Sequence, residues 1–488
     1  MIRIALCGAL PLLTSACFAP SRAPVDPVAA QIPASEEASA EASADSAEAG
    51  SAAVPADLAS QALAEHAAAG SGASEPTPEP EPVAQFDAWG VRVCSADADL
   101  PDRTAQFLQA IERSRSAGYD AVIQNAPARR AQVLMSEVGA DTDGAPCVRR
   151  YSWRADAEHF YPASAMKTVG AIGAALALQP HASAGWTVDT PLRIGQRTVA
   201  LDSGEVTVGA DRSSVSLRQL LDDTLVESSN PGFNALFDIA GVHGCNRVLW
   251  DLGFDSVRTF HRLSMGGTDP AAHGFLPSVH MRLNGTWVDA LPERDEDLDA
   301  VPSATGDVMI GTAYISDLDG ARVSEPLDFA RKNYVALHDL QGILIYLTQP
   351  ELLDLTADPL TAAHRRVLAD VMTGPLQDRG GVSASERESR FKPMLPGLLS
   401  VHADRGDWVY TNKAGRAYGF HLDSAFIEHR PSNTRFYLAA TVFVDTDGTM
   451  NDNVYAYESL SFPFLQGVGQ AMAELMTVSA DATMDAPH

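Results

Sequence analysis

Lysine is almost absent from this chain. Of 35 basic residues only four are lysines, and they are Lys167, Lys332, Lys392 and Lys413. Arginine keeps its charge in a protein, whereas a buried lysine can lose its proton and act as a base. A lysine in such a chain therefore indicates a position where chemistry, and not surface charge alone, can be expected.

Positive charge is scarce overall. The 63 acidic residues outnumber the 35 basic ones and leave a formal net charge of −28. Binding of nucleic acid depends on clustered lysine and arginine side chains that neutralise phosphates. The sequence therefore predicts no nucleic-acid partner, although the charge does not specify a substrate.

Long apolar runs are also missing, apart from one near the N-terminus. The run "IALCGALPLLTSA" follows Arg3 and is too short to span a bilayer, which is typical of an export signal. "LTSAC", ending at Cys17, resembles a bacterial lipobox and predicts lipid on Cys17; the alternative is ordinary cleavage after Ala19. We expect a signal peptide over residues 1–19 and a protein on the periplasmic side. The lipid would anchor it to the bacterial outer membrane, and we expect no other membrane contact.

Cysteine is sparse as well. Cys7 and Cys17 belong to the expected signal, which leaves Cys94, Cys147 and Cys245. At most one internal disulfide can form among three cysteines in an oxidising compartment, and we predict Cys94 with Cys147. The chain has no CxxC and no HExxH motif, so we predict no metal site and no cofactor.

Aromatic residues are nearly missing from residues 20–85, which consist mainly of alanine, serine, glutamate and proline. This segment has 11 acidic residues and one basic residue, Arg22. Such a composition cannot bury enough apolar surface to order itself, so we predict a disordered acidic linker. The globular domain is then expected over residues 86–480, with a disordered tail at 481–488.

Strand-like runs open and close this domain. "AQVLMSEVG" and "CVRRYSW" lie near its start, and "DWVYTNKAG", "YGFHLDSAFIEH" and "RFYLAATVFVDT" lie near its end. Helical patterns lie between and after them, at about 165–178, 216–227, 335–348, 361–373 and 461–477. We predict an α+β fold with one antiparallel sheet built from both chain ends. Helices would cover the faces of that sheet, and the middle subdomain would be largely helical.

The first candidate site is Ser164-Ala-Met-Lys167. If a helix begins at Ser164, the hydroxyl and the amine share one face and can meet. Apolar flanks would bury Lys167 and favour its neutral form, which is a general base beside a nucleophile. The alternative is a chance Ser-x-x-Lys on a helix, which the scarcity of lysine makes less attractive.

Two further motifs follow in order. Ser228-Ser229-Asn230 lies in a loop before Pro231, which can open the next helix. Lys413-Ala-Gly415 closes a strand near a hairpin, where the glycine would allow a ligand to approach the backbone. Alone, the first is an ordinary capped turn and the second a turn with a solvated lysine.

Together the three motifs resemble the serine β-lactamase and penicillin-binding-protein superfamily, closest to class A β-lactamases, over roughly residues 120–480. "WTVDTPLRI", "SSNPGFNALFDIAG", "LGFDSVRTFHRL" and "RFKPMLP" fit the same family context. The resemblance implies a β-lactamase/transpeptidase-like fold and a set of site roles. Ser164 is the acylated nucleophile, Lys167 its general base and Ser228 the relay of a proton to the leaving nitrogen. Asn230 holds a substrate amide, Lys413 stabilises charge, and the backbone N–H groups of Ser164 and Arg416 form the oxyanion hole beside Gly415.

The chain departs from that family in three places. Ser229 replaces the aspartate of S-D-N, and Ala414 replaces the hydroxyl residue of K-T-G; we expect the Arg416 guanidinium to bind a substrate carboxylate instead. Ser264 stands where the deacylating glutamate is expected, and an insertion follows over about 264–334. Glu325 in that insertion is the candidate surrogate base.

Three functions stay open. The first is a serine acyl-hydrolase that opens a β-lactam through an acyl-enzyme on Ser164. The second is a D-Ala-D-Ala peptidase or esterase with the same machinery. The third is a penicillin-recognising or wall-binding module without turnover. Each implies a small-molecule β-lactam or a peptidoglycan-like ligand, and we expect a monomer.

Overall fold

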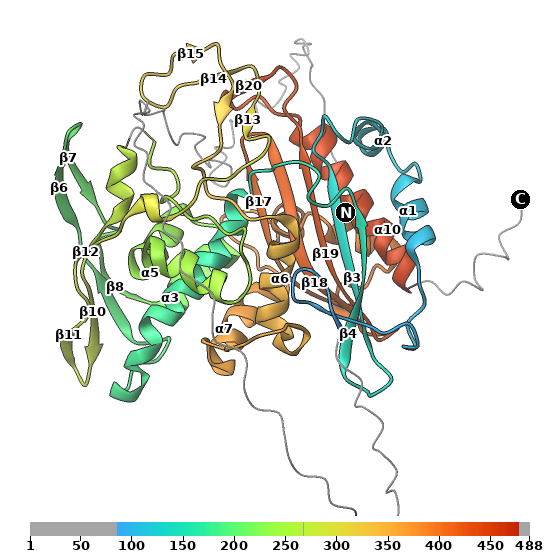
Figure 1. The fold of residues 1–488 in the computed structure, drawn as a ribbon, viewed down its shortest axis with the longest axis horizontal. Coiled ribbons are helices and arrows are strands. Elements are labelled where there is room, and N and C mark those ends of the chain that lie inside the picture. Colours follow the sequence, from blue (N-terminus) through green and yellow to red (C-terminus); the bar gives the residue numbers. More distant parts are fainter. Residues whose placement is uncertain (1–84, 267, 478–488) are drawn as a thin grey trace, which may run out of the picture. The chain divides into compact units, whose positions relative to one another are not determined.

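A computed structural model describes residues 85–266 and 268–477 (Figure 1). The predicted signal peptide of residues 1–19 with Cys17, nearly all of the predicted linker of residues 20–85, and the predicted tail of residues 481–488 lie outside the described residues. These three assignments therefore stay predictions. Within the described ranges, no helix is long and apolar enough to cross a membrane.

A seven-stranded sheet joins strands from both ends of the described chain (Figure 1). Its order is β1–β2–β4–β3–β19–β18–β17. The strands are β1 (Gln85–Phe86), β2 (Arg92–Val93), β3 (Gln132–Ala140), β4 (Pro146–Trp153), β17 (Trp408–Ala417), β18 (Phe420–His429) and β19 (Thr434–Phe443). The prediction of a sheet from both ends is confirmed. One contact departs from the antiparallel pattern, because β2 and β4 run parallel where Val93 pairs with Val148.

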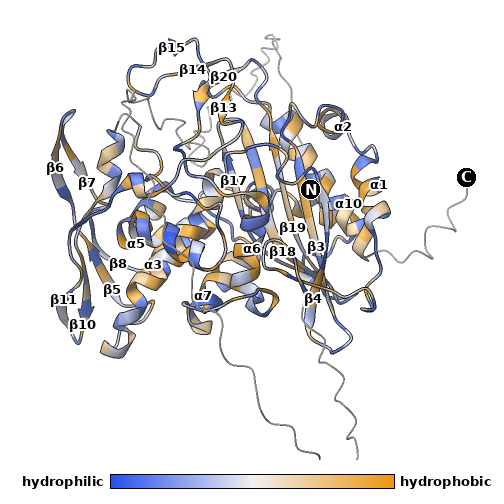
Figure 2. Ribbon diagram, viewed as in Figure 1, coloured by the Kyte–Doolittle hydropathy of each residue, from blue (hydrophilic) through white to orange (hydrophobic). Residues whose placement is uncertain are grey.

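Helices cover both faces of the sheet, because successive strand side chains point to opposite sides. In β19, Phe436 and Leu438 join one apolar cluster, whereas Tyr437 and Ala439 join the other. The first cluster includes α1 (Thr104–Glu112), α2 (Ala117–Gln124), α9 (Leu395–Val401) and α10 (Phe462–Thr477). The second includes α3 (Lys167–Leu178), α5 (Asn230–Asp251), α6 (Leu337–Thr348) and α7 (Ala362–Met372). Figure 2 shows apolar residues along these helices and the central strands.

The predicted helices occur close to their expected bounds. The helix expected at 216–227 is α4 (Leu217–Leu221) followed by a π-helical turn, η3 (Asp222–Val226). It begins with a capping box, in which the Ser216 side chain accepts from the Gln219 N–H and the Gln219 side chain from the Ser216 N–H. One further helix, α8 (Ala384–Phe391), precedes α9.

The middle of the chain, which was expected to be largely helical, also contains strands. A four-stranded sheet has the order β11–β10–β5–β8, and β6 pairs with β7. These strands are β5 (Pro191–Ile194), β6 (Arg197–Leu201), β7 (Gly204–Val208), β8 (Arg212–Ser216), β10 (Val279–Leu283) and β11 (Thr286–Leu291). Asn284 and Gly285, both with positive φ, form the β10–β11 turn. An Asn-Gly pair between apolar runs is a hairpin signal that was available in the sequence.

The insertion expected at about 264–334 packs against the domain. It contains β9 (Phe275–Leu276), β12 (Arg294–Asp295), β13 (Met309–Ile310), β14 (Ala313–Ile315), β15 (Arg322–Val323) and β16 (Leu327–Asp328). β14 pairs with β15 and, in parallel, with β20 (Thr449–Met450). The Phe329 ring of the insertion contacts the rings of Tyr161, Tyr418 and Phe420. Since Tyr161 lies three residues before Ser164, the insertion buttresses the segment that carries Ser164.

A disulfide joins Cys94 and Cys147, as predicted. Cys147 belongs to β4, and Cys94 directly follows β2. The bond therefore ties the start of the described chain to the central sheet. Cys245 is buried in α5 as a free thiol, and burial raises its pKa.

Candidate active site

Ser164 and Lys167 meet at the start of α3. Ser164 lies in a 3₁₀ turn, η1 (Ala163–Met166), and Lys167 is the first residue of α3. The Lys167 Nζ atom lies 2.8 Å from Ser164 Oγ, and both side chains are buried. The face shared by the two residues is therefore the one that the Ser-x-x-Lys spacing predicts.

The hydrogen bonds of Lys167 are compatible with a neutral amine that acts as a base. Its Nζ atom donates to the Ser228 carbonyl oxygen at 2.6 Å and to Asn230 Oδ1 at 2.7 Å, and both partners accept. A neutral amine has two N–H groups and one lone pair. In the neutral form, donation of both N–H groups to these two acceptors directs the lone pair at the Ser164 hydroxyl, whose proton it can then receive.

Ser228 lies between two lysines. Its Oγ atom is 3.0 Å from Lys413 Nζ and 3.3 Å from Lys167 Nζ. Lys413 comes from β17 and Ser228 from the loop before α5, so residues 185 positions apart meet here. A hydroxyl held between two amines can pass a proton from one side of the site to the other.

Burial lowers the pKa of Lys413 to about 7. Asp423 opposes this shift and the nearby Lys392 adds to it. Lys413 therefore changes charge near neutral pH, unlike an exposed lysine.

Gly415 lets β17 approach the turn that carries Ser164. A Cβ atom at this position would lie 2.2 Å from the Pro162 carbonyl oxygen and about 3 Å from the backbone nitrogens of Ser164 and Ala165. No side chain fits there. The glycine thus allows the close approach of η1, whereas the expected approach was that of a ligand.

The Arg416 side chain does not face the site. Lys413 and Arg416 are three residues apart on one strand, so they point to opposite faces. The Arg416 guanidinium lies over the rings of Tyr457 and Phe462, at 5.1 and 5.6 Å from their centroids. These contacts correct the expectation that Arg416 binds a carboxylate.

The Arg416 backbone N–H does point outward. Tyr418 and Gly419 have positive φ values and form a two-residue turn, so the Ala417–Phe420 pair next to it exchanges hydrogen bonds. Pairs alternate along an antiparallel ladder, which leaves the Arg416 N–H free of β18 at the sheet edge. It is therefore available as an oxyanion donor, one residue from the glycine that packs on the Ser164 nitrogen.

Ser229 and Pro231 fix the start of α5. The Ser229 side chain accepts from the Gly232 N–H at 3.0 Å as N-cap, and Pro231 lies in the first helical turn. Ser229 thus has a structural role in the S-S-N motif. Asn230 at the same helix start enters the site, where its Oδ1 accepts from Lys167 and its Nδ2 donates to Ser264 Oγ at 2.5 Å.

The segment before Ser264 is bound along α5. The Asn234 side chain bonds both the N–H and the carbonyl of Leu263, at 2.7 and 2.9 Å. One turn further, Asp238 forms a buried ion pair with Arg262 at 2.7 Å. Ser264 is therefore placed in the site by α5, at the position where the family resemblance expects a glutamate.

Three residues with strained backbone conformations lie around Lys167. Ala163, Ser228 and Ser264 have φ values of 47°, 54° and 54°. Non-glycine residues rarely adopt this left-handed conformation, and when they do they cluster at functional sites. All three residues belong to or adjoin the hydrogen-bonded group around Lys167.

Glu325 does not join this group. It is exposed in the turn between β15 and β16, and within residues 85–266 and 268–477 it forms no hydrogen bond or ion pair. The side chains of Ser164, Ser228, Asn230, Ser264 and Lys413 make no hydrogen bond to a carboxylate within the described part of the chain. The structure therefore gives no support to Glu325 as a surrogate base.

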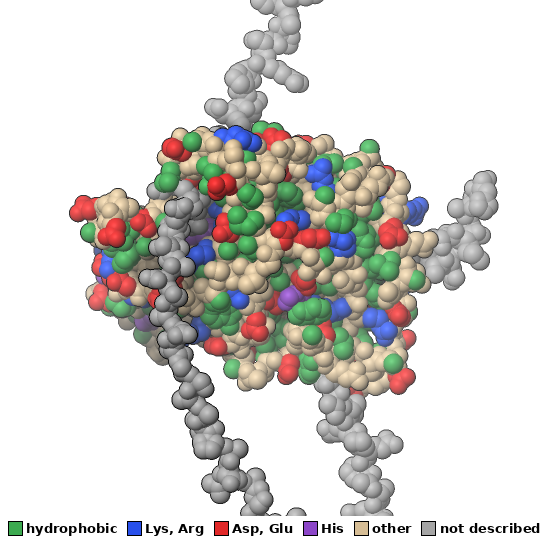
Figure 3. Space-filling view, turned by 45° about the horizontal axis from the view of Figure 1, so that its top comes forward, with side chains coloured by type: hydrophobic (Ala, Val, Ile, Leu, Met, Phe, Trp, Pro, Cys, Tyr) green, Lys and Arg blue, Asp and Glu red, His purple; other side chains and the backbone are tan. Residues whose placement is uncertain are grey.

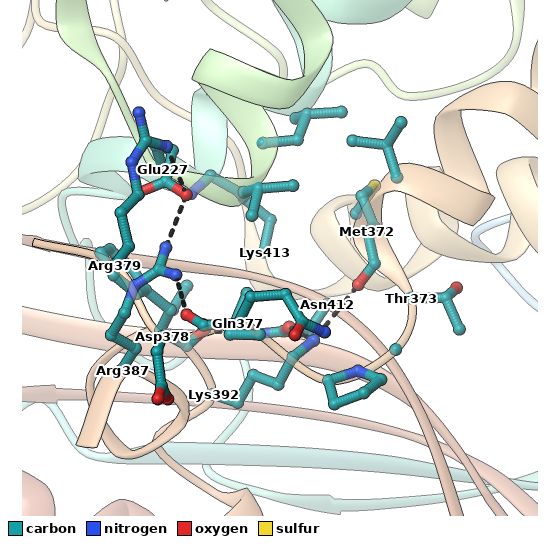
Figure 4. A pocket seen from close by; sticks show the side chains of 18 residues that line it. Glu227, Met372, Thr373, Gln377, Asp378, Arg379, Arg387, Lys392, Asn412 and Lys413 are labelled. Carbon is teal, nitrogen blue, oxygen red and sulfur yellow. Dashed lines mark hydrogen bonds and ion pairs between the residues drawn. The ribbon is translucent and has the colours of Figure 1, made fainter. Parts of the chain in front are cut away.

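A pocket of about 300 Å³ opens beside Lys413 (Figure 4). Its titratable lining is Glu227, Asp378, Arg379, Arg387, Lys392 and Lys413, which is four basic and two acidic side chains. Glu227 accepts from Arg379 at 2.8 Å and from Arg387 at 2.5 Å. In a chain with a net charge of −28, this pocket favours an anionic ligand.

Lys392 is a site neighbour that sequence reasoning missed. Its Nζ atom donates to the carbonyls of Met372 and Tyr410 and to Asn412 Oδ1, over 3.0–3.3 Å. Burial lowers the pKa of Lys392 to about 8. Each of the four lysines is at most 5% exposed, and three of the four line the site or its pocket. The scarcity of lysine was the available signal.

In residues 85–266 and 268–477, no group of three or more His, Cys, Asp or Glu side chains can hold a metal ion. On the face shown in Figure 3, acidic and basic side chains are interspersed, without a basic stripe over the described residues.

A family model described as "Beta-lactamase enzyme family" matches residues 149–457, which is more than half of the chain. The chain belongs to the β-lactamase enzyme family. No curated protein matches it. Its α+β fold is that of the serine β-lactamases and penicillin-binding proteins, as the sequence resemblance implied.

Several solved structures resemble this family member. A β-lactamase from Desulfarculus baarsii is 17% identical, with 78% of this chain and 100% of that chain covered and a TM-score of 0.40. A β-lactamase from Xanthomonas campestris pv. campestris is 18% identical, with 76% and 96% covered and a TM-score of 0.39. A mutant of PBP-A, solved as an acyl-enzyme complex with penicillin G, is 13% identical, with 77% and 98% covered and a TM-score of 0.40.

Proposed function

We propose that this β-lactamase family member is a serine acyl-hydrolase that opens a β-lactam through an acyl-enzyme on Ser164. The observation that carries the proposal is the 2.8 Å contact between Lys167 Nζ and Ser164 Oγ, beside two further acceptors of the same nitrogen, the Ser228 carbonyl oxygen at 2.6 Å and Asn230 Oδ1 at 2.7 Å. A nucleophile with its base already in hydrogen-bond reach needs no rearrangement before attack.

Acylation then proceeds with every proton accounted for. Lys167 takes the Ser164 proton while Oγ attacks the lactam carbonyl carbon. The resulting oxyanion accepts from the N–H groups of Ser164 and Arg416. When the carbon–nitrogen bond breaks, Ser228 donates its proton to the leaving nitrogen and is reprotonated from Lys167, which lies 3.3 Å away. The amine is neutral again at the end of the step.

The pocket beside Lys413 supports a substrate that carries a carboxylate. Ala414 has no hydroxyl to offer such a group, and the Arg416 guanidinium is held by two aromatic rings. Protonated Lys413 and the exposed Arg379 in the pocket lining supply the positive charge instead. We therefore assign carboxylate recognition to these two side chains.

We expect release of the acyl group to be slower than acylation at this site. Ser264 offers a hydroxyl where a carboxylate base would accept a proton from water, and a neutral hydroxyl does not take up that proton efficiently. This observation favours a second candidate, a D-Ala-D-Ala peptidase or esterase of the penicillin-binding-protein type. The third candidate, a wall-binding module without turnover, corresponds to release that is slower still.

A substrate panel tests the proposal. The protein is incubated with a chromogenic cephalosporin, a D-Ala-D-Ala peptide and a small ester, next to Ser164→Ala. Hydrolysis of the cephalosporin by the wild type alone supports the proposed function. Hydrolysis of the peptide or ester without reaction of any β-lactam supports the second candidate. Equal activity of Ser164→Ala would show that the reaction takes place elsewhere.

The cellular setting is part of the proposal. We propose that the chain acts as an exported monomer on the periplasmic side of the bacterial outer membrane, anchored by lipid on Cys17. The apolar run before Cys17 and the acidic composition of residues 20–85 support this arrangement. Labelling with a radioactive fatty acid in the producing cell, with Cys17→Ser as control, tests the anchor.

A further inference from the structure

We infer that Ser264 is a positioning residue, which orients the Asn230 amide and through it the proton-accepting lone pair of Lys167. The inference rests on the proposed acylation of Ser164. Ser264 lies where the family resemblance expects the deacylating glutamate. We infer that its hydroxyl acts in acylation and not in release of the acyl group.

The geometry around Asn230 carries the inference. Its Nδ2 donates to Ser264 Oγ at 2.5 Å, and its Oδ1 accepts from Lys167 Nζ at 2.7 Å. If the amide turned over, Nδ2 would face the Lys167 amine and would donate to its lone pair. Lys167 would then lose the Asn230 acceptor, and its lone pair would no longer be available to the Ser164 hydroxyl. With Oδ1 accepting from Lys167, the Ser264 hydroxyl accepts from Nδ2 and so holds the amide at the position that this orientation needs.

Ser264 itself is held in place from several sides. The side chains of Asn234, Asp238 and Asn246, which lie along α5, bond the segment from Thr259 to Leu263. Asn333 accepts from the backbone N–H groups of Phe260 and His261. These contacts hold a serine whose φ of 54° is unfavourable for a residue with a side chain. A strained conformation that so many bonds impose is typical of a functional position.

The left-handed backbone makes a sharp experiment possible. Ser264→Gly removes the hydroxyl and relieves the strain, Ser264→Ala removes the hydroxyl alone, and Ser264→Asn restores an acceptor on a residue that tolerates this conformation. Asn433→Gly, at φ 53° in the turn after β18, is the matched control for strain outside the site. The readout is the rate at which a fluorophosphonate probe labels Ser164, measured beside the thermal midpoint.

We expect Ser264→Gly and Ser264→Ala to label about tenfold more slowly than the wild type, and Ser264→Asn to return to within about twofold. Asn433→Gly should label at the wild-type rate. Wild-type labelling of a folded Ser264→Gly variant would overturn the inference, as would a failure of Ser264→Asn to recover. A merely structural role would lower the thermal midpoint without this pattern of rescue.

The experiment can overturn the proposed function and the Ser264 inference independently of each other. If the probe labels the wild type but no β-lactam acylates it, the proposed substrate is wrong, while the Ser264 variants still decide the inference. If penicillin acylates the wild type and Ser264→Gly equally fast, the inference is wrong while the function stands. If neither reagent reacts with Ser164, Lys167 does not activate it and both are overturned.

Discussion

The amine nitrogen of Lys167 lies 2.8 Å from the hydroxyl oxygen of Ser164, and it also donates to the Ser228 carbonyl oxygen and to Asn230 Oδ1. This contact explains why position 167 is one of the few in the chain occupied by lysine and not by arginine. All four lysines are buried, and a base that must be neutral is the one role that arginine cannot fill.

Lys167→Arg should therefore abolish acylation while the protein still folds. A guanidinium keeps its proton, so Ser164 would lose its general base, and we expect acylation to slow by about a thousandfold. The measurement is the rate of penicillin adduct formation followed by intact mass. Lys332→Arg is the matched control, because Lys332 is also buried but lies against Phe329 and Tyr418, where an arginine can keep the cation–π contact. Equal rates for Lys167→Arg and the control would remove Lys167 from its role.

Gly415→Ala should impair both stability and acylation. Its new methyl group would lie 2.2 Å from the Pro162 carbonyl oxygen and would push β17 away from the turn that carries Ser164. We expect a loss of about 1–3 kcal/mol in the free energy of unfolding, together with much slower labelling of Ser164. Gly244→Ala is the control, since a Cβ atom there meets only Ala240 at an ordinary 3.7 Å. A Gly415→Ala protein with unchanged melting and labelling would contradict the close packing.

Binding of a carboxylate substrate should weaken as the pH rises through about 7. Protonated Lys413 is the form that attracts the carboxylate, and burial lowers the pKa of Lys413 to about 7, so its charged fraction falls above that pH. We expect the dissociation constant of the first complex to rise about tenfold per pH unit above pH 7. Presteady-state kinetics separate this constant from the acylation step, which needs neutral Lys167 and should not fall over the same range.

Two comparisons make the pH prediction specific. A substrate of similar size without a carboxylate should bind with the same affinity on both sides of pH 7. Lys413→Arg keeps its charge throughout and should flatten the pH dependence for the carboxylate substrate. A pH dependence that survives in Lys413→Arg would assign the titration to another group.

Ser264→Glu should accelerate release of the acyl group. The side chains of Ser164, Ser228, Asn230, Ser264 and Lys413 make no hydrogen bond to a carboxylate in the described residues, so a carboxylate at position 264 would supply a base for water. We expect the adduct lifetime to shorten by about a hundredfold. Ser264→Gln has the same size without the base and should not shorten it. Equal lifetimes for the glutamate and glutamine variants would show that the missing base is not what limits release.

The sequence predicted the parts of this structure that local patterns encode. The alternating strands, the periodic helices and the Ser164–Lys167 spacing all depend on residues that are neighbours in the chain. Strand alternation relative to Lys413 was a local signal that the Arg416 side chain faces away from the site, and it was not used. The rings of Tyr457 and Phe462, over which the guanidinium lies, come from residues about 40 positions away, and no local pattern identifies them. Lys392 is similar, because its partners on α7 and β17 come together only in the folded protein.

Other differences came from signals that were present but overlooked. The Asn284-Gly285 pair between two strand-like runs predicts the β10–β11 hairpin. The middle of the chain was nevertheless expected to be largely helical. Gly415 was correctly selected as a close-approach position, but the sequence does not say whether a ligand or the protein itself approaches.

The central claim is that Ser164 forms an acyl-enzyme that is slow to be released. Intact-mass spectrometry of the protein after brief exposure to penicillin G, followed over hours and with the modified peptide mapped, measures it most directly. The account predicts one adduct per chain, located on the peptide with Ser164, absent from Ser164→Ala, and persisting long after the free drug is removed. An unmodified protein, or an adduct on any other residue, would contradict it.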